Sequence, residues 1–163
     1  MGKELITFDN IEDDEILRRD FFAKYYDNGV WSYNVFQLRD LTPPENYISL
    51  SRTKISPDAV SSAIKIYSIG RLKKLLGYAL LRAKDVKDIE SPLQKQLLTT
   101  DYEDNAHAGL FTWTKDGVLL EGSVESPDIL RLKKNLLALA QQNYADYPAG
   151  AFDDVINAKK VTN

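Results

Sequence analysis

A β-hairpin signature followed directly by a long amphipathic helix pattern, between residues 110 and 144, constrains the fold more than any other feature of the chain. Asp116-Gly117 separates the β-rich segments 110–114 and 118–121, which predicts a tight hairpin. From Ser126 to about Tyr144, apolar residues recur at helical spacing over about half of the helix circumference. Neighbouring strands next to a helix of this length predict a fold that mixes α and β elements.

The remaining segments alternate irregularly between helical and extended patterns. We expect helices over about residues 10–28, 56–69, 72–83 and 152–158, and a short one after Pro92. We expect strands over about residues 5–8, 30–38 and 47–51. Since the strands can pair with near neighbours in the sequence, the pattern favours an α+β fold. The chain is expected to form one domain over residues 1–163, with several helices packed on a small, mainly antiparallel sheet.

The chain has no cysteine, so disulfides and cysteine-bound zinc cannot stabilise it. Its 163 residues suffice for a continuous core, and 44% hydrophobic with 28% charged residues is typical of a folded globular protein. No apolar run reaches the roughly 18 residues that span a membrane, and the N-terminal residues lack a signal-peptide pattern. Phosphate-loop and dinucleotide-binding motifs are also missing from the sequence. We therefore expect a cytoplasmic protein with no membrane contact and no cofactor.

His107, the only histidine, follows a cluster of carboxylates. Asp104 lies three residues before it, so in a turn or helical stub the two side chains could face the same side. This arrangement would allow His107 and Asp104 to be catalytic, with the imidazole as general base. Asp101 and Asp104 are the candidate metal ligands, for magnesium, manganese or calcium rather than zinc. The alternative is an acidic loop that leads into a strand, with a structural histidine.

Charge is segregated along the chain although the net charge is only −3. Residues 85–128 carry ten acidic and three basic side chains, whereas residues 59–84 carry six basic and no acidic ones. Either the two regions meet within the fold, or they form complementary surfaces for a partner. Eight of the chain's aromatic residues also fall between Phe21 and Tyr47, as core residues or as a contact surface. The candidate partner-binding residues are Asp101, Glu103, Tyr25, Tyr26, Arg71 and Lys74.

Arg52 and Lys54 form a further candidate site, because they end a predicted strand just before a predicted helix. Two bases at such a position could hold a phosphate or a carboxylate. No glycine-rich loop accompanies them, so ligand binding here rests on the two side chains alone.

Three functions follow from these patterns. The first is a small macromolecule-binding protein of the inhibitor, immunity or adaptor type, whose partner is another protein. The second is a metal-assisted hydrolase or phosphodiesterase that uses His107 and the nearby carboxylates. The third is nucleic-acid binding through the basic 59–84 region, which the acidic net charge disfavours.

Overall fold

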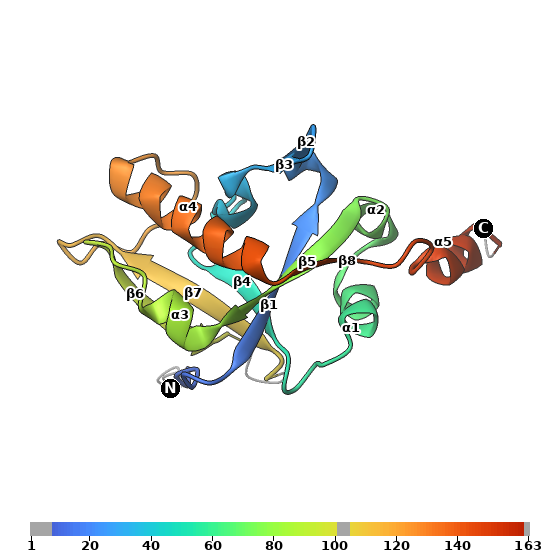
Figure 1. The fold of residues 1–163 in the computed structure, drawn as a ribbon, viewed down its shortest axis with the longest axis horizontal. Coiled ribbons are helices and arrows are strands. Elements are labelled where there is room, and N and C mark those ends of the chain that lie inside the picture. Colours follow the sequence, from blue (N-terminus) through green and yellow to red (C-terminus); the bar gives the residue numbers. More distant parts are fainter. Residues whose placement is uncertain (1–7, 101–104, 162–163) are drawn as a thin grey trace, which may run out of the picture.

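A sheet of six strands forms the centre of the fold, in the order β6-β7-β4-β1-β5-β8, and each pair of neighbours is antiparallel (Figure 1). The computed structural model describes residues 8–100 and 105–161. The strands are β1 (Ile16–Phe22), β4 (Ile48–Arg52), β5 (Leu75–Arg82), β6 (Gln94–Thr99), β7 (His107–Trp113) and β8 (Tyr144–Asp146). A separate small hairpin, β2 (Tyr26–Asp27) with β3 (Val30–Trp31), projects from one end of the molecule.

The helices are short except for α4. They are α1 (Ala59–Ile66), α2 (Ile69–Leu72), α3 (Ala83–Lys87), α4 (Pro127–Gln142) and α5 (Asp153–Val161), with 3₁₀ helices η1 (Ala23–Tyr25) and η2 (Tyr33–Phe36). Ser126 caps α4, because its side chain accepts a hydrogen bond from the Ile129 amide, and Asp58 caps α1 in the same way.

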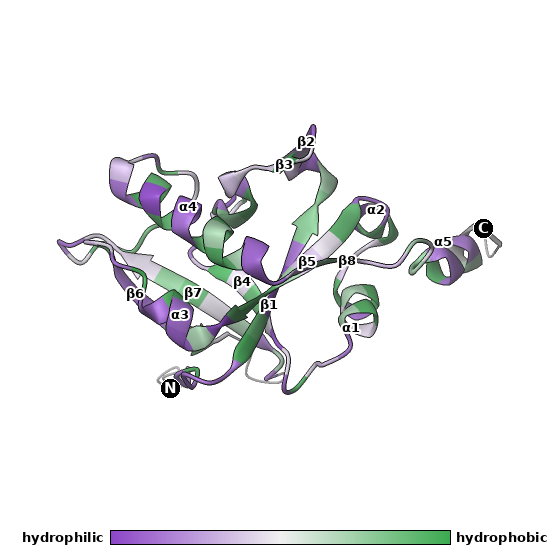
Figure 2. Cartoon of the chain, viewed as in Figure 1, coloured by the Kyte–Doolittle hydropathy of each residue, from purple (hydrophilic) through white to green (hydrophobic). Residues whose placement is uncertain are grey.

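Apolar residues form one cluster on each face of the sheet. The larger cluster joins α4 and η2 to the sheet through residues such as Leu17, Phe21 and Leu136. The smaller cluster joins α1, α2 and the start of α5 to the opposite face and includes Leu72 and Phe152. Hydrophobic residues accordingly line much of β1, β5 and β7, whereas α4 also carries hydrophilic residues (Figure 2).

The register of the strands determines which side chains share a face. Leu17 of β1 pairs with Arg52 of β4, and Arg18 pairs with Ser51. Ser51 in turn pairs with His107 of β7. Since side chains alternate along a strand, Leu17 and Phe21 point toward α4, whereas Arg18, Ser51 and His107 lie on the opposite face.

The α+β class and the mainly antiparallel sheet are confirmed. The structure also confirms the strand at 47–51 as β4, the C-terminal helix as α5, the long helix as α4 and the first part of helix 56–69 as α1. The predicted hairpin turn at Gly117 is present, with a φ of 85°. The predicted second strand, residues 118–121, is reduced to one isolated β-bridge between Leu119 and Trp113. The strand expected at 5–8 lies mostly outside the described residues.

Four predicted elements are wrong. Residues 16–22 form β1 instead of a helix, residues 75–82 form β5, and the segment after Pro92 forms β6. Residues 30–38 hold only the short β3 and then η2. β5 lies between two other strands of the sheet, and apolar residues occur on both of its faces. Because its apolar residues form a continuous run, their spacing does not distinguish a strand from a helix.

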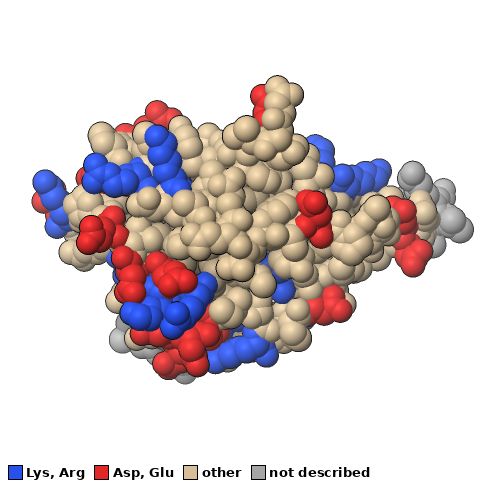
Figure 3. Space-filling model, in the orientation of Figure 1, with Lys and Arg blue, Asp and Glu red and all other residues tan. Residues whose placement is uncertain are grey.

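Within the described residues, no helix is long and apolar enough to cross a membrane. Acidic and basic side chains lie next to one another around α3 (Figure 3). Two ion pairs account for this, Lys84 with Asp88 and Lys87 with Asp13. Part of the basic 59–84 region therefore meets acidic residues within the fold.

A candidate anion-binding site

A cavity of about 450 Å³ lies over the face of the sheet opposite to α4. Its floor comes from β1, β4 and β7, and its walls come from η1, the segment of residues 37–47 and the segment that links α1 to α2. This volume is in the range of sites that bind small molecules, roughly 300–1,000 Å³.

The strand register places three polar side chains in one row across the floor. Arg18, Ser51 and His107 are successive cross-strand partners and share the cavity face. Neighbouring strands are about 4.8 Å apart, so the row extends over roughly 10 Å between the outer Cα atoms. A guanidinium, a hydroxyl and an imidazole in one row are groups that can donate hydrogen bonds to an anion.

Arg18 is the most unusual side chain of the floor, because it is 2% exposed and incompletely hydrogen-bonded. Its Nη1 donates to the carbonyl of Ser56 at 3.0 Å. Its Nε and Nη2 are buried and have no hydrogen-bond partner among the described residues. An unpaired buried polar group costs free energy, and the cost is larger for a charged one. The guanidinium therefore has two donors that the described part of the fold does not satisfy.

Arg19 follows Arg18, the last residue of β1 that pairs with β4. Its Nη1 donates to the carbonyl of Ser49 at 2.8 Å, and its Nε and Nη2 donate to the carbonyl of Val35 at 3.1 and 2.7 Å. Burial lowers the pKa of Arg19, but a guanidinium keeps its charge at neutral pH. Arg19 thus adds a fixed positive charge to the cavity while its hydrogen bonds hold the wall.

The cavity is positively charged although the protein is acidic overall. Two of the described lining residues are acidic, Asp20 and Glu45. Six are basic, namely Arg18, Arg19, Lys24, Arg39, Arg71 and Lys74. With the histidine neutral, the described lining residues have a surplus of four positive charges in a chain whose net charge is −3.

Glu45 is committed to Arg39. The Arg39 Nε and Nη2 donate to the two carboxylate oxygens at 3.0 and 3.1 Å, and the Arg39 backbone amide donates at 2.7 Å. Burial alone would raise the pKa of Glu45, but these hydrogen bonds outweigh it and the pKa lies below its ordinary value. Glu45 therefore neutralises Arg39, and its charge also acts on Arg19.

Asp20, next to Arg19 on β1, receives two phenol hydrogen bonds at the centre of this face. Tyr67 donates to its Oδ2 at 2.7 Å, and Tyr147 donates to its Oδ1 at 2.6 Å. Burial raises the pKa of both tyrosines, and the negative charge of Asp20 raises it further. Both phenols thus remain protonated and hold the carboxylate in one orientation.

Aromatic faces position two of the bases in the wall. The guanidinium of Arg71 lies 4.6 Å from the ring centres of both Phe22 and Tyr67, and the Lys24 ammonium lies 4.9 Å from that of Tyr25. Such contacts fix a cation without neutralising it. These two side chains and Lys74 form a cationic wall that is distinct from Arg18 on the floor.

The structure brings together four residues from separate sequence hypotheses. His107, Tyr25, Arg71 and Lys74 all line this cavity. Tyr26 does not line it: it lies in β2, half exposed, with its ring 4.8 Å from that of Trp31. The candidate residues Asp101, Glu103 and Asp104 lie outside the described residues. Among the residues described, no group of three potential ligands could hold a metal ion.

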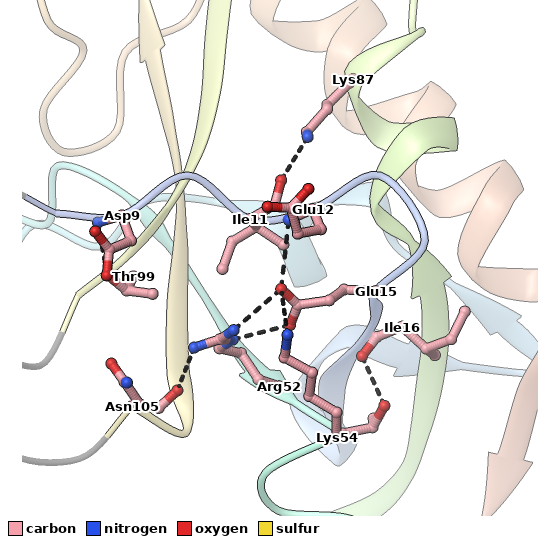
Figure 4. A network of polar contacts seen from close by, with 11 residues as sticks. Asp9, Ile11, Glu12, Glu15, Ile16, Arg52, Lys54, Lys87, Thr99 and Asn105 are labelled. Atoms are coloured by element: carbon pink, nitrogen blue, oxygen red, sulfur yellow. Dashed lines mark hydrogen bonds and ion pairs between the residues drawn. The ribbon is translucent and has the colours of Figure 1, made fainter.

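Arg52 and Lys54 lie in a different network, around Glu15 (Figure 4). Arg52 donates to both carboxylate oxygens of Glu15 at 2.9 and 3.1 Å and to the carbonyl of Asn105 at 3.0 Å. The Lys54 ammonium is 3.5 Å from the same carboxylate. Through these buried contacts, Arg52 joins β4 to the segments before β1 and β7.

Arg18, Arg19 and Asp20, which line the cavity, were not predicted as site residues from the sequence. The signal was three consecutive charged residues between Leu17 and Phe21-Phe22. When this segment is considered as a strand, Arg18 and Asp20 fall on the same face as Phe22. The incorrect helix prediction for residues 10–28 concealed this alternation.

The comparisons with known proteins add no relative. No family model, curated protein or solved structure matches the chain. The class of protein that fold and cavity define is therefore an α+β protein with a basic cavity on an antiparallel sheet.

Proposed function

We propose that this protein binds a small anionic ligand, of the phosphate type, in the cavity over β1, β4 and β7. The observation that carries the proposal is Arg18, whose buried guanidinium has two nitrogens without a partner among the described residues. A phosphate oxygen is an electrostatic match for such a group, because a guanidinium can donate two parallel hydrogen bonds.

The charge of the lining supports the same conclusion. The described lining residues carry a surplus of four positive charges, and a cleft lined by one sign of charge attracts ligands of the opposite sign. Ser51 and His107, in the same row as Arg18, offer a hydroxyl and an imidazole to the remaining oxygens. A bound anion would therefore satisfy Arg18 and reduce repulsion among the bases together.

Isothermal titration calorimetry with inorganic phosphate tests the proposal. At fixed pH and ionic strength, the wild-type protein is expected to bind one phosphate with a Kd of roughly millimolar or below. Arg18→Met should abolish the binding. Arg131→Met is the matched control, because Arg131 is exposed on α4, which covers the opposite face, and it should bind phosphate like the wild type.

Arg71→Gln provides a second test that does not depend on a buried substitution. Arg71 is exposed, so this variant should fold normally, and the loss of one wall charge should weaken phosphate binding severalfold. The proposal is wrong if phosphate does not bind the wild type, or if Arg18→Met binds it equally well.

Binding of a protein partner is the second candidate function. Tyr25, Arg71 and Lys74 were predicted as contact residues from the sequence, and all three line the cavity. They could receive an acidic side chain of a partner in place of a small anion. In that case free phosphate would bind weakly, and charge reversal at Arg71 or Lys74 would weaken the partner complex without lowering the melting temperature.

A further inference from the structure

The cavity contains two positively charged regions rather than one. Arg18 lies on the floor beside Ser51, and Arg71 lies over the Phe22 ring. Arg18 and Phe22 are four residues apart on β1, so their Cα atoms are roughly 13 Å apart along the strand. Lys24 and Lys74 belong to the same wall as Arg71. A single phosphate bound at Arg18 would therefore leave the cationic wall unused.

A carboxylate lies between these two regions. Asp20 is midway between Arg18 and Phe22 on β1 and shares their face. Each of its oxygens accepts one phenol hydrogen bond, from Tyr67 or from Tyr147. A carboxylate oxygen can accept more than one hydrogen bond, so Asp20 can still accept from a hydroxyl. Its negative charge repels any anionic group placed at the same point.

From this order of charges, we infer that the ligand carries two phosphate groups separated by a hydroxyl-bearing carbon skeleton, as in a sugar bisphosphate. One phosphate binds Arg18, the second binds the wall of Arg71 and Lys74, and a hydroxyl between them donates to Asp20. This inference rests on the proposed anion-binding function and specifies its ligand class.

Four probes separate the features of such a ligand. Inorganic phosphate tests the anion site alone, and glucose 6-phosphate adds hydroxyls. Fructose 1,6-bisphosphate has two separated phosphates with hydroxyls between them. Tripolyphosphate has more charge but no hydroxyl, and its charge is continuous. Titration calorimetry on the full chain measures the Kd of each probe. A constant ionic strength keeps the screening of the charges the same in every titration.

The bisphosphate is expected to bind at least about tenfold more tightly than glucose 6-phosphate, because its second contact is intramolecular. Tripolyphosphate should bind more weakly than the bisphosphate, since its central phosphate would face Asp20. Asp20→Asn, which removes this negative charge, should increase the affinity for tripolyphosphate but should not increase the affinity for the bisphosphate to the same extent.

Variants of the wall test the second contact. Lys74→Gln and Arg71→Gln should reduce the advantage of the bisphosphate over glucose 6-phosphate severalfold, whereas Arg131→Gln, which removes the same charge elsewhere, should preserve it. A melting curve of each variant, Asp20→Asn included, verifies that it is folded.

The outcomes distinguish this inference from the proposed function. If phosphate binds through Arg18 but the bisphosphate binds no more tightly than the monophosphate, the two-phosphate ligand is excluded and the anion site stands. Equal or tighter binding of tripolyphosphate would exclude the hydroxyl contact at Asp20. If none of the four probes binds, the proposed function fails together with the inference.

Discussion

Arg18 is buried, but two of its nitrogens have no hydrogen-bond partner among the described residues. A buried arginine with a structural role would have its hydrogen bonds satisfied within the protein, whereas one that binds a ligand keeps donors for it. We predict that Arg18→Met leaves the free energy of unfolding unchanged or raises it by about 1–4 kcal/mol in anion-free buffer, as replacement of buried charges by apolar side chains often does. Urea denaturation measures this difference, with Arg131→Met as the control. A strong loss of stability would instead make Arg18 a structural residue.

Glu15 is the opposite case, a buried charge whose partners are all in place. It is 5% exposed and forms two hydrogen bonds with Arg52. We predict that Glu15→Gln lowers the free energy of unfolding by about 3–5 kcal/mol, because it leaves Arg52 buried without its counter-charge. The exposed Glu90→Gln is the control and should change the stability by less than about 0.5 kcal/mol.

The same carboxylate gives a pH dependence. Burial would raise the pKa of Glu15, but the hydrogen bonds and charge of Arg52 outweigh it and hold the pKa below its ordinary value of 4.5. The stabilisation is therefore complete above pH 4.5 and is lost as the pH falls through the lower pKa of the folded state. Urea denaturation between pH 3 and pH 7 should show a shallower acid limb in Glu15→Gln than in the wild type; parallel limbs would contradict this assignment.

At the level of elements, the contact between β7 and Tyr47 shapes one end of the cavity. A Cβ atom at Gly109 would lie 2.7 Å from both the Tyr47 ring and the Thr100 side chain. We predict that Gly109→Ala lowers the free energy of unfolding by about 1–3 kcal/mol through overpacking. Gly70→Ala is the matched control, because a Cβ there meets nothing within 4 Å, and it should be neutral or stabilising. Equal effects of the two substitutions in denaturant unfolding would refute the steric account.

Elements with a complete local signal were predicted well from the sequence. α4 has an apolar stripe, Ser126 as its N-cap and Pro127 in its first turn. Residue spacing, capping and the position of proline therefore all predict the same helix. The turn at Gly117 was predicted for the same reason. β1 and β5 were not, because they lie in the interior of the sheet, where pairing with strands on both sides overrides local periodicity.

The candidate site was predictable only in part. His107, Tyr25, Arg71 and Lys74 were recognised by residue type, but the sequence alone could not bring them together. Their meeting depends on the pairing of β4 with β7, of β4 with β1 and of β1 with β5, contacts between residues 30 or more positions apart. Arg18 was missed because a buried arginine is recognisable only once the strand that carries it is known.

For the whole molecule, the account predicts that anions stabilise an acidic protein through one site. A ligand at ten times its Kd adds about 1.4 kcal/mol to the free energy of unfolding, which raises the Tm by about 3–6 °C for a chain of this size. Thermal unfolding with phosphate should show this rise in the wild type and in Arg131→Met, but not in Arg18→Met. Sodium chloride at equal ionic strength controls for general screening; an identical rise with chloride would contradict site binding.

The most direct test of the central claim uses His107, whose imidazole is the only one in the chain and lines the cavity. Its NMR signal can be followed while phosphate is added at constant pH and ionic strength. The account predicts a saturable shift in the wild type and in Arg131→Met, with no such shift in Arg18→Met. An imidazole signal that does not respond to phosphate, or that responds equally in Arg18→Met, would show that the cavity is not an anion site built on Arg18.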